Sequence, residues 1–316
     1  MSSASDRFPS ADGPGSVTHA PGLPAGFTDT FASRYVEAGG LRQHAVIGGD
    51  GPPVLLIHGW PENWYAWRHL MPALAQDFEV VAVDQRGIGL TDKPQDGYDT
   101  GSLADDMVAL MAALGHERFA VVGHDTGFAI GYALAADHPE CVERVALAEI
   151  PGPPDTAASP PAFVPEGINN RLWHIPFNRV AGLPEQLIAG REAAYFGYEF
   201  EVQGGNRLPQ EAIDYYVGLV SNPESLRGSL AWYRAFDATL AQNAQRKTTK
   251  LAMPVLAIGG SASYGDHVAE AMRPIAADVQ AVVVPETGHW VAEDAPDEVL
   301  TALAVFLAPY REGKTA

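Results

Sequence analysis

Short apolar segments alternate with helical patterns over much of the chain, and this alternation limits the folds that the chain can adopt. The apolar segments comprise residues 54–57, 80–83, 119–122, 145–148, 254–258 and 281–284. Because their apolar character is continuous, we expect strands buried on both faces, as in a parallel sheet. Helical patterns at residues 102–114 and 127–136 lie between successive segments. The sequence therefore predicts a doubly wound α/β fold whose functional residues follow the carboxyl ends of the strands.

Residues 151–250 interrupt this order, beginning with Pro151-Gly152-Pro153-Pro154. Up to about Lys250 the pattern is helical and aromatic, without a clear strand. We expect a helical cap inserted into one core, which spans residues 31–150 and 251–316. The core opens with a predicted β-hairpin, and residues 1–30 are expected to form a flexible leader because Ser, Pro, Gly and Ala dominate their start.

The composition excludes several classes of partner. The chain has 39 acidic and 20 basic residues, a net charge of −19, so we expect neither nucleic acid nor an anionic membrane as a partner. No apolar run reaches the roughly 18–20 residues that span a bilayer, and no signal peptide is recognisable, so a cytoplasmic location is expected. Metal-ligand spacing such as His-Glu-x-x-His is missing, so we expect neither a metal nor an organic cofactor. The sequence leaves open whether the chain forms a homodimer.

One turn has the form of a nucleophile-bearing elbow. The sequence Gly123-His124-Asp125-Thr126-Gly127 follows an apolar segment and precedes a helical pattern. Small residues on either side of the central position suit a cramped turn with strained dihedral angles. Such a turn would present the Asp125 side chain at a helix N-terminus, where backbone N–H groups stabilise negative charge. An ordinary turn with a helix-capping Asp is the alternative interpretation, and the strand and helix on either side make it the weaker one.

A carboxylate at this position restricts the chemistry. It is a weak nucleophile toward an acyl carbon, but it can displace a leaving group at an sp3 carbon and so form an alkyl ester. Water must then hydrolyse that ester at the enzyme's own carbonyl carbon. The substrate class predicted for Asp125 is therefore an epoxide or an alkyl halide.

Two further segments supply groups for ester hydrolysis. The turn at Trp60 ends the first buried strand and would place its backbone N–H beside that of Thr126, giving two donors for an oxyanion. His289 follows the last strand, where a general base of this architecture is expected, and its ordinary pKa suits it to deprotonate water.

The acid that orients His289 has two candidates. Glu149 stands at the end of the strand that follows the elbow helix, and a carboxylate there needs a partner when it is buried. Asp266 comes several residues after a later strand, where Ser261 occupies the usual position of the acid. We favour Glu149, with Asp266 as the alternative acid.

Four motifs occur in a characteristic order along the chain: His58-Gly59-Trp60-Pro61-Glu62, Asp84-Gln85-Arg86-Gly87-Ile88-Gly89, Gly123-His124-Asp125-Thr126-Gly127 and Gly288-His289-Trp290. Together they resemble the α/β-hydrolase-fold epoxide hydrolases over residues ~30–310. The closest resemblance is to the bacterial Cif-type subgroup, in which the acid follows the strand after the elbow helix. The resemblance implies a mostly parallel eight-stranded sheet with helices on both faces and an inserted helical cap.

The same resemblance assigns roles to two cap residues. His174 matches the ring-opening histidine of the subgroup, and Tyr233, in Trp232-Tyr233-Arg234, matches the tyrosine of a widespread cap motif. Both could donate a hydrogen bond to the epoxide oxygen and protonate the alkoxide. The expected substrates are a small apolar epoxide and water, although aromatic packing of the cap would also account for these residues.

Two rival functions remain. Dehalogenases share the fold and the Asp, but haloalkane enzymes typically carry Trp after the nucleophile, and fluoroacetate enzymes carry Arg near the elbow. Thr126 and Ala129 occupy the matching positions here, which leaves haloalkane or haloacid dehalogenation as the alternative. A non-catalytic relative that only binds a ligand is the second alternative, and the presence of a candidate for each catalytic group speaks against it.

Overall fold

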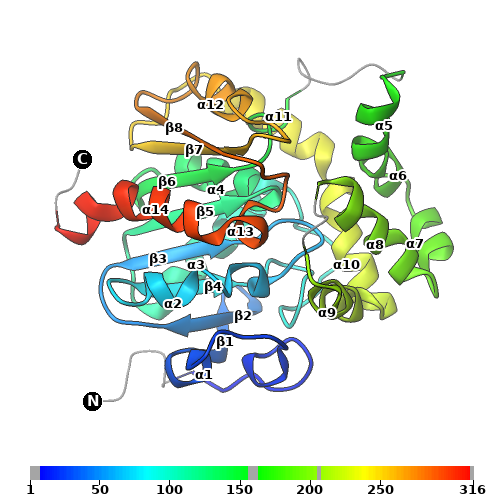
Figure 1. Cartoon of the computed structure of the whole chain (residues 1–316), viewed down its shortest axis with the longest axis horizontal. Coiled ribbons are helices and arrows are strands. Elements are labelled where there is room, and N and C mark those ends of the chain that lie inside the picture. The colour runs from blue at the N-terminus through cyan, green and yellow to red at the C-terminus, as the bar shows by residue number, and fades with distance from the viewer. Residues whose placement is uncertain (1–7, 156–162, 205–207, 314–316) are drawn as a thin grey trace.

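A single eight-stranded sheet forms the centre of the molecule (Figure 1). The computed structural model describes residues 8–155, 163–204 and 208–313. The strands are β1 (Ala32–Ala38), β2 (Leu41–Gly48), β3 (Pro53–Ile57), β4 (Glu79–Val83), β5 (Phe119–His124), β6 (Val142–Ala148), β7 (Val255–Gly260) and β8 (Val279–Val284). They lie in the order β1-β2-β4-β3-β5-β6-β7-β8. β2 is antiparallel to both β1 and β4, and the other neighbouring strands are parallel. The predicted mostly parallel α/β sheet is confirmed.

Helices cover both faces of the sheet. One face packs against α3 (Thr100–Leu114), α4 (Thr126–Asp137) and α12 (His267–Met272); the other carries η3 (Trp64–Trp67), α2 (Met71–Leu74), α13 (Val291–Asp294) and α14 (Pro296–Arg311). Successive residues of one strand serve opposite faces, so that Leu55 joins the cluster around α3 and Leu56 joins the cluster around α14. Burial on both faces explains why these strands are continuously apolar in sequence.

The first described residues differ from the expected leader. Residues 1–7 lie outside the described part, but residues 8–30 include η2 (Val17–His19) and α1 (Phe27–Thr30), and Phe27 is buried. The Trp64 indole Nε1 donates a hydrogen bond of 2.6 Å to the Gly15 carbonyl oxygen. Residues 8–30 of the expected leader thus contribute buried side chains and hydrogen bonds to the core.

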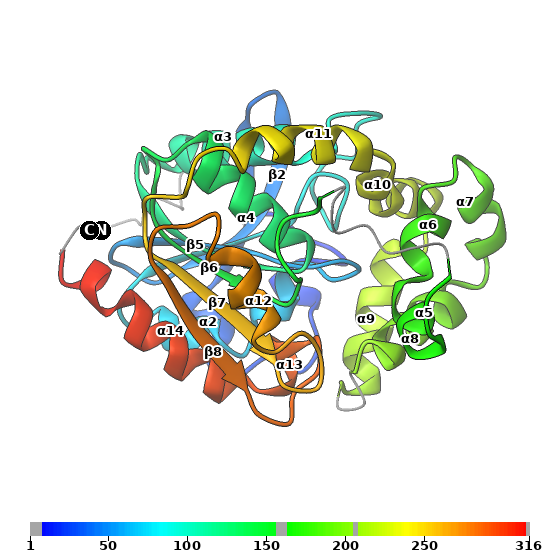
Figure 2. The same cartoon turned by 90° about the horizontal axis from the view of Figure 1, so that it is seen from above.

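The region between β6 and β7 is helical, as expected. It contains α5 (Glu166–Leu172), α6 (His174–Asn178), α7 (Leu183–Ile188), α8 (Glu192–Val202), α9 (Gln210–Val220), α10 (Pro223–Arg234) and α11 (Phe236–Arg246). Helices α5 to α9 gather beyond one end of the sheet in both views, whereas α11 returns along α3 and α4 (Figures 1 and 2). We propose residues 151–250 as the cap insertion, with α11 as its return to the core. None of the described helices is long and apolar enough to cross a membrane.

Helix α4 approaches the sheet closely through a glycine. A Cβ atom on Gly127 would lie only 2.0 Å from the Ile57 carbonyl oxygen of β3. Because that atom belongs to the backbone of a central strand, it cannot move aside without disturbing the sheet.

We expect Gly127→Ala to lower the free energy of unfolding by about 3 kcal/mol or more, since the added methyl overlaps backbone. The matched control is Gly218→Ala at an exposed position of α9, where an added Cβ would meet no atom outside its own helix within 4 Å. That change should raise stability by about 0.5–1 kcal/mol, because alanine has the higher helix propensity. Urea unfolding curves measure both, and equal effects at the two positions would contradict the packing argument.

Candidate active site

Asp125 occupies the predicted elbow between β5 and α4. Its φ of 52° and ψ of −112° lie outside the regions that most residues adopt. A Cβ on Gly123 would lie 2.2 Å from the Gly127 carbonyl oxygen, so the turn requires glycine there. The Asp125 N–H donates to the Ala148 carbonyl oxygen at the end of β6, which fixes the turn to the sheet. The Asp125 side chain is 20% exposed and lines a cavity.

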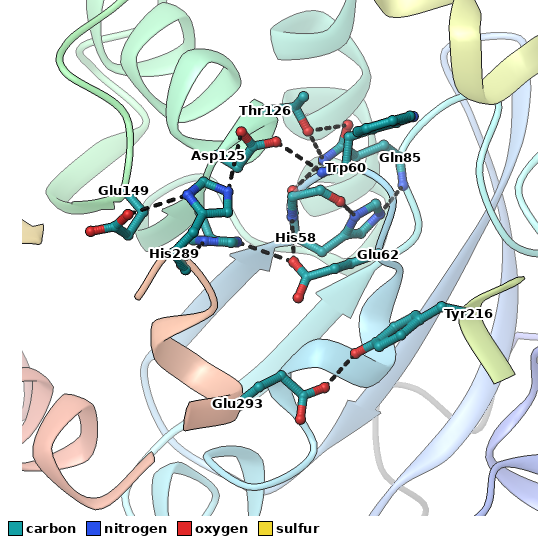
Figure 3. A network of polar contacts seen from close by, with 12 residues as sticks. His58, Trp60, Glu62, Gln85, Asp125, Thr126, Glu149, Tyr216, His289 and Glu293 are labelled. Atoms are coloured by element: carbon teal, nitrogen blue, oxygen red, sulfur yellow. Dashed lines mark hydrogen bonds and ion pairs between the residues drawn. The ribbon is translucent and has the colours of Figure 1, made fainter. Parts of the chain in front are cut away.

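The turn after β3 directs a hydrogen-bond donor at this carboxylate. The Trp60 backbone N–H donates to Asp125 Oδ1 at 2.9 Å (Figure 3). Thr126 is the first residue of α4, and its hydroxyl contacts the Gln85 side chain. The role of the Thr126 backbone N–H as a second oxyanion donor stays a prediction.

His289 lies between two carboxylates (Figure 3). Its Nε2 is 3.6 Å from Asp125 Oδ2, and its Nδ1 is 3.2 Å from Glu149 Oε2. Glu149 is fully buried, directly after β6, and its other oxygen accepts a hydrogen bond from the Gly260 N–H at the end of β7. Asp266 is exposed at the start of α12. Of the two candidate acids, the structure brings Glu149 to His289.

The two cap candidates line the same cavity as Asp125. His174, the first residue of α6, stacks on the Trp60 indole with ring centroids 5.2 Å apart. Tyr233 of α10 packs edge-on against Trp60 at 5.1 Å and against His174 at 5.7 Å. Burial, together with the nearby Asp125 charge, raises the pKa of Tyr233 well above its ordinary value. Its hydroxyl therefore keeps its proton at neutral pH and can act as a donor.

These side chains line one small cavity of about 70 Å³. Its walls are mostly apolar and aromatic, and the described lining residues are Trp60, Asp125, Ile150, Leu172, His174, Ile175, Glu199, Gln203, Tyr233, Tyr264, His289 and Trp290. Neither arginine nor lysine occurs among these lining residues. A carboxylate substrate would thus meet two acidic side chains here, and histidine is the only basic residue type among these lining residues.

A buried ion pair next to Asp125 was not predicted from the sequence. His124, next to Asp125, places Nδ1 3.1 Å from Glu62 Oε2 and Nε2 2.8 Å from the His289 carbonyl oxygen. Burial alone would lower the pKa of His124, but the Glu62 charge and hydrogen bond outweigh it and raise the pKa to about 9. Burial would likewise raise the pKa of Glu62, and His124 holds it below its usual value. The pair is therefore ionised. Through His124 it links the segment that carries Asp125 to the segment that carries His289.

Glu199 of α8 was also missed. It is 1% exposed and lines the cavity beside His174. A signal was present in the sequence, because Glu199 falls within an aromatic helical stretch that includes Tyr195 and Phe196, where a charged residue on the apolar side is unusual.

Residues 52–296 match the family model described as alpha/beta hydrolase fold. The chain belongs to the α/β-hydrolase fold family. An elbow nucleophile, a base after the last strand and a helical insertion over the strand ends are the arrangement expected of this family.

Comparison with similar proteins shows which members of this family the chain resembles. The chain is 34% identical to the soluble epoxide hydrolase of Corynebacterium sp. (strain C12), covering 86% of this chain and 96% of that relative. It is 30% identical to the fluoroacetate dehalogenase of Burkholderia sp, covering 90% and 96%. The crystal structure of wild-type Cfl2 from Burkholderia cenocepacia superposes with a TM-score of 0.83 at 35% identity, covering 90% and 98%. The expected relationship to α/β-hydrolase epoxide hydrolases is confirmed.

We expect the His124–Glu62 pair to make stability depend on pH in a defined window. A raised pKa of about 9 means that the His124 contribution is complete below about pH 6.5 and is lost as the pH rises through about 9. The lowered pKa of Glu62 means that its contribution is present above about pH 4.5 and is lost as the pH falls further. Glu62→Gln should therefore reduce the free energy of unfolding by about 3–5 kcal/mol near pH 6–7, with a smaller deficit above pH 9.

Urea unfolding of both proteins between pH 5 and 10 measures this difference. Asp105→Asn is the matched control, because it breaks a contact of 2.8 Å between Asp105 and His138 at the surface. That exposed pair should contribute less than about 1 kcal/mol. A deficit for Glu62→Gln that does not change with pH would contradict the ionised pair.

Proposed function

We propose that this α/β-hydrolase is an epoxide hydrolase that converts a small apolar epoxide to a vicinal diol through a covalent alkyl ester on Asp125. The observation that carries the proposal is the position of Asp125 Oδ2 and His289 Nε2, 3.6 Å apart, at the floor of a cavity roofed by His174 and Tyr233. A nucleophile, a base and two proton donors thus converge on one small volume.

In the first step, Asp125 attacks an epoxide carbon. Because Oδ1 accepts the Trp60 N–H, Oδ2 is the oxygen free to form the new C–O bond. The ring C–O bond breaks, and its electron pair becomes an alkoxide that receives a proton from the cap. The Tyr233 hydroxyl, with its raised pKa, and the His174 imidazole are the donors that face the cavity.

In the second step, water hydrolyses the ester. His289 takes a proton from water, and the resulting hydroxide attacks the Asp125 carboxyl carbon. Negative charge then develops on Oδ1, where the Trp60 N–H already points and where we place the Thr126 N–H as second donor. Collapse of this intermediate breaks the ester C–O bond, and the leaving oxygen takes the proton of the newly added hydroxyl group, which releases the diol and restores the carboxylate. Glu149 keeps the His289 ring in the required orientation and stabilises its cation.

The shape and charge of the cavity favour an epoxide over a haloacid. A haloacid substrate carries a carboxylate, and the described lining residues offer it Asp125 and Glu199 but no arginine or lysine. The volume of about 70 Å³ is well below the ~300–1,000 Å³ of pockets for drug-sized ligands, which supports a small substrate. The similarity to a fluoroacetate dehalogenase keeps dehalogenation as the second candidate.

We expect His289→Ala to accumulate the alkyl ester, because alkylation does not need the base whereas hydrolysis does. Incubation with a terminal epoxide should add the full mass of the epoxide to the peptide that contains Asp125, as measured by mass spectrometry. The double variant with Asp125→Ala should show no adduct, and the wild type should form diol.

Two outcomes would contradict the proposal. One is diol formation by Asp125→Ala at the wild-type rate. The other is halide release from haloalkanes or haloacids by a wild-type enzyme that leaves every epoxide unchanged, which would favour dehalogenation. A single wild-type turnover in ¹⁸O-labelled water provides an independent check, since attack at the carboxyl carbon places the label in Asp125.

We expect Glu149→Gln to reduce the hydrolysis of the ester by roughly 10²–10⁴-fold, because an amide neither stabilises the His289 cation nor enforces its orientation. Asp266→Asn should change it less than about twofold, since Asp266 is exposed at the start of α12. The rate at which the Asp125 adduct disappears after rapid mixing measures both. A larger loss for Asp266→Asn would make Asp266 the orienting acid.

A further inference from the structure

A buried carboxylate in the cap has no hydrogen-bond partner among the described residues. Glu199 of α8 is 1% exposed, and among the described residues neither of its side-chain oxygens has a hydrogen-bond partner. Its Oε2 lies 3.1 Å from His174 Nδ1, close enough for an ion pair although not aligned for a hydrogen bond. Leaving an ionised carboxylate in this state costs several kcal/mol. Such uncompensated burial is typical of functional sites.

We propose that Glu199 is a positioning residue that keeps His174 doubly protonated, so that His174 can donate a proton to the epoxide oxygen. The proposal deepens the function above and rests on it. It concerns how the ring-opening donor obtains its proton, because Glu199 itself stands behind His174 and acts through it.

The orientation of the His174 imidazole explains why the ring must be doubly protonated to donate a proton into the cavity. Nδ1 is buried and faces Glu199, which leaves Nε2 as the nitrogen available to a ligand in the cavity. A neutral ring with its proton on Nδ1 has only a lone pair on Nε2 and cannot donate there. Donation from Nε2 therefore requires the imidazolium, whose second proton a neighbouring carboxylate stabilises.

The contacts around the ring support the same role. Stacking on Trp60, with only 12° between the ring planes, and the edge of Tyr233 fix the plane of the imidazole. The other titratable groups on this cavity are Asp125, His289 and Tyr264 from the core. Alkylation removes the charge of Asp125, whereas Glu199 takes no part in bond formation. Glu199 is thus the counter-ion that persists through the reaction.

The proton balance is closed. The ring C–O bond breaks, the alkoxide takes the Nε2 proton, and His174 becomes neutral with its remaining proton on Nδ1. His289 separately removes a proton from the hydrolytic water. Solvent exchange after diol release returns a proton to His174 and removes one from His289, so the net reaction remains epoxide plus water to diol.

The test is the rate of Asp125 alkylation in a single turnover, measured by rapid quenching and mass spectrometry between pH 5.5 and 9. In the wild type this rate should fall as the pH rises and His174 loses its proton. Glu199→Gln removes the charge that favours the cation, so the fall should move to lower pH by about one unit, with a roughly tenfold loss at pH 8. Substrate affinity should change little, which separates this role from shaping of the cavity.

Two comparisons show whether Glu199 acts through His174. In a His174→Gln background, Glu199→Gln should have no further effect on alkylation, because the donor is already gone. Glu201→Gln, an exposed position on the same helix, should match the wild type at every pH. Glu199→Asp keeps the charge and should retain the wild-type pH dependence, which gives a second reading if Glu199→Gln does not fold.

The outcomes separate this proposal from the proposed function. A wild type that forms the Asp125 adduct, with a Glu199→Gln variant of the same rate and pH profile, would overturn the role of Glu199 alone. That role would also be overturned if Glu199→Gln reduces alkylation equally with and without His174, or if Glu199→Asp loses the wild-type profile. A wild type that forms neither adduct nor diol from any epoxide would overturn the proposed function instead.

Discussion

The backbone of Asp125 is the constraint on which the rest of the site depends. A positive φ at a residue with a side chain is unfavourable, and it persists here because β5, β6 and α4 fix the turn from both sides. The glycine at position 127 lets α4 approach β3, and the same approach brings the turn after β3 within hydrogen-bonding distance of the carboxylate. The strained dihedral angles and the hydrogen bond from the Trp60 N–H therefore have one origin, the close packing of α4 on the sheet.

Buried charge around this turn is arranged in separate pairs. Glu149 contacts His289 on one side of the nucleophile, and Glu62 contacts His124 beneath it. Glu199 and His174 face each other in the cap. In each pair an acid fixes one nitrogen of an imidazole and leaves the other nitrogen for a different task. In the proposed mechanism, His289 is the base, His174 is the acid and His124 holds neighbouring segments together, and each has a different acidic partner.

Much of this organisation follows from the sequence because it depends on local patterns. Strands buried on both faces read as continuous apolar runs, and a carboxylate that ends such a run, like Glu149, must find a partner nearby. Contacts between residues far apart in the sequence produce no such local pattern. The hydrogen bond from Trp64 to Gly15 holds a segment whose composition suggests flexibility. Glu199 meets His174 only after α6 and α8 pack together, so neither residue's spacing indicates the other.

Trp60 lies in the core and also contacts the cap. Its backbone N–H holds Asp125, while its indole stacks on His174 and donates from Nε1 to the Ser229 hydroxyl of α10 at 2.8 Å. A displacement of α10 must either break that bond or carry the indole with it. The position of α10 in the cap and the position of the Trp60 backbone donor are consequently coupled through a single residue. Under the proposed mechanism, a cap that keeps α10 on the Trp60 indole therefore also keeps the Trp60 N–H in place for ester hydrolysis.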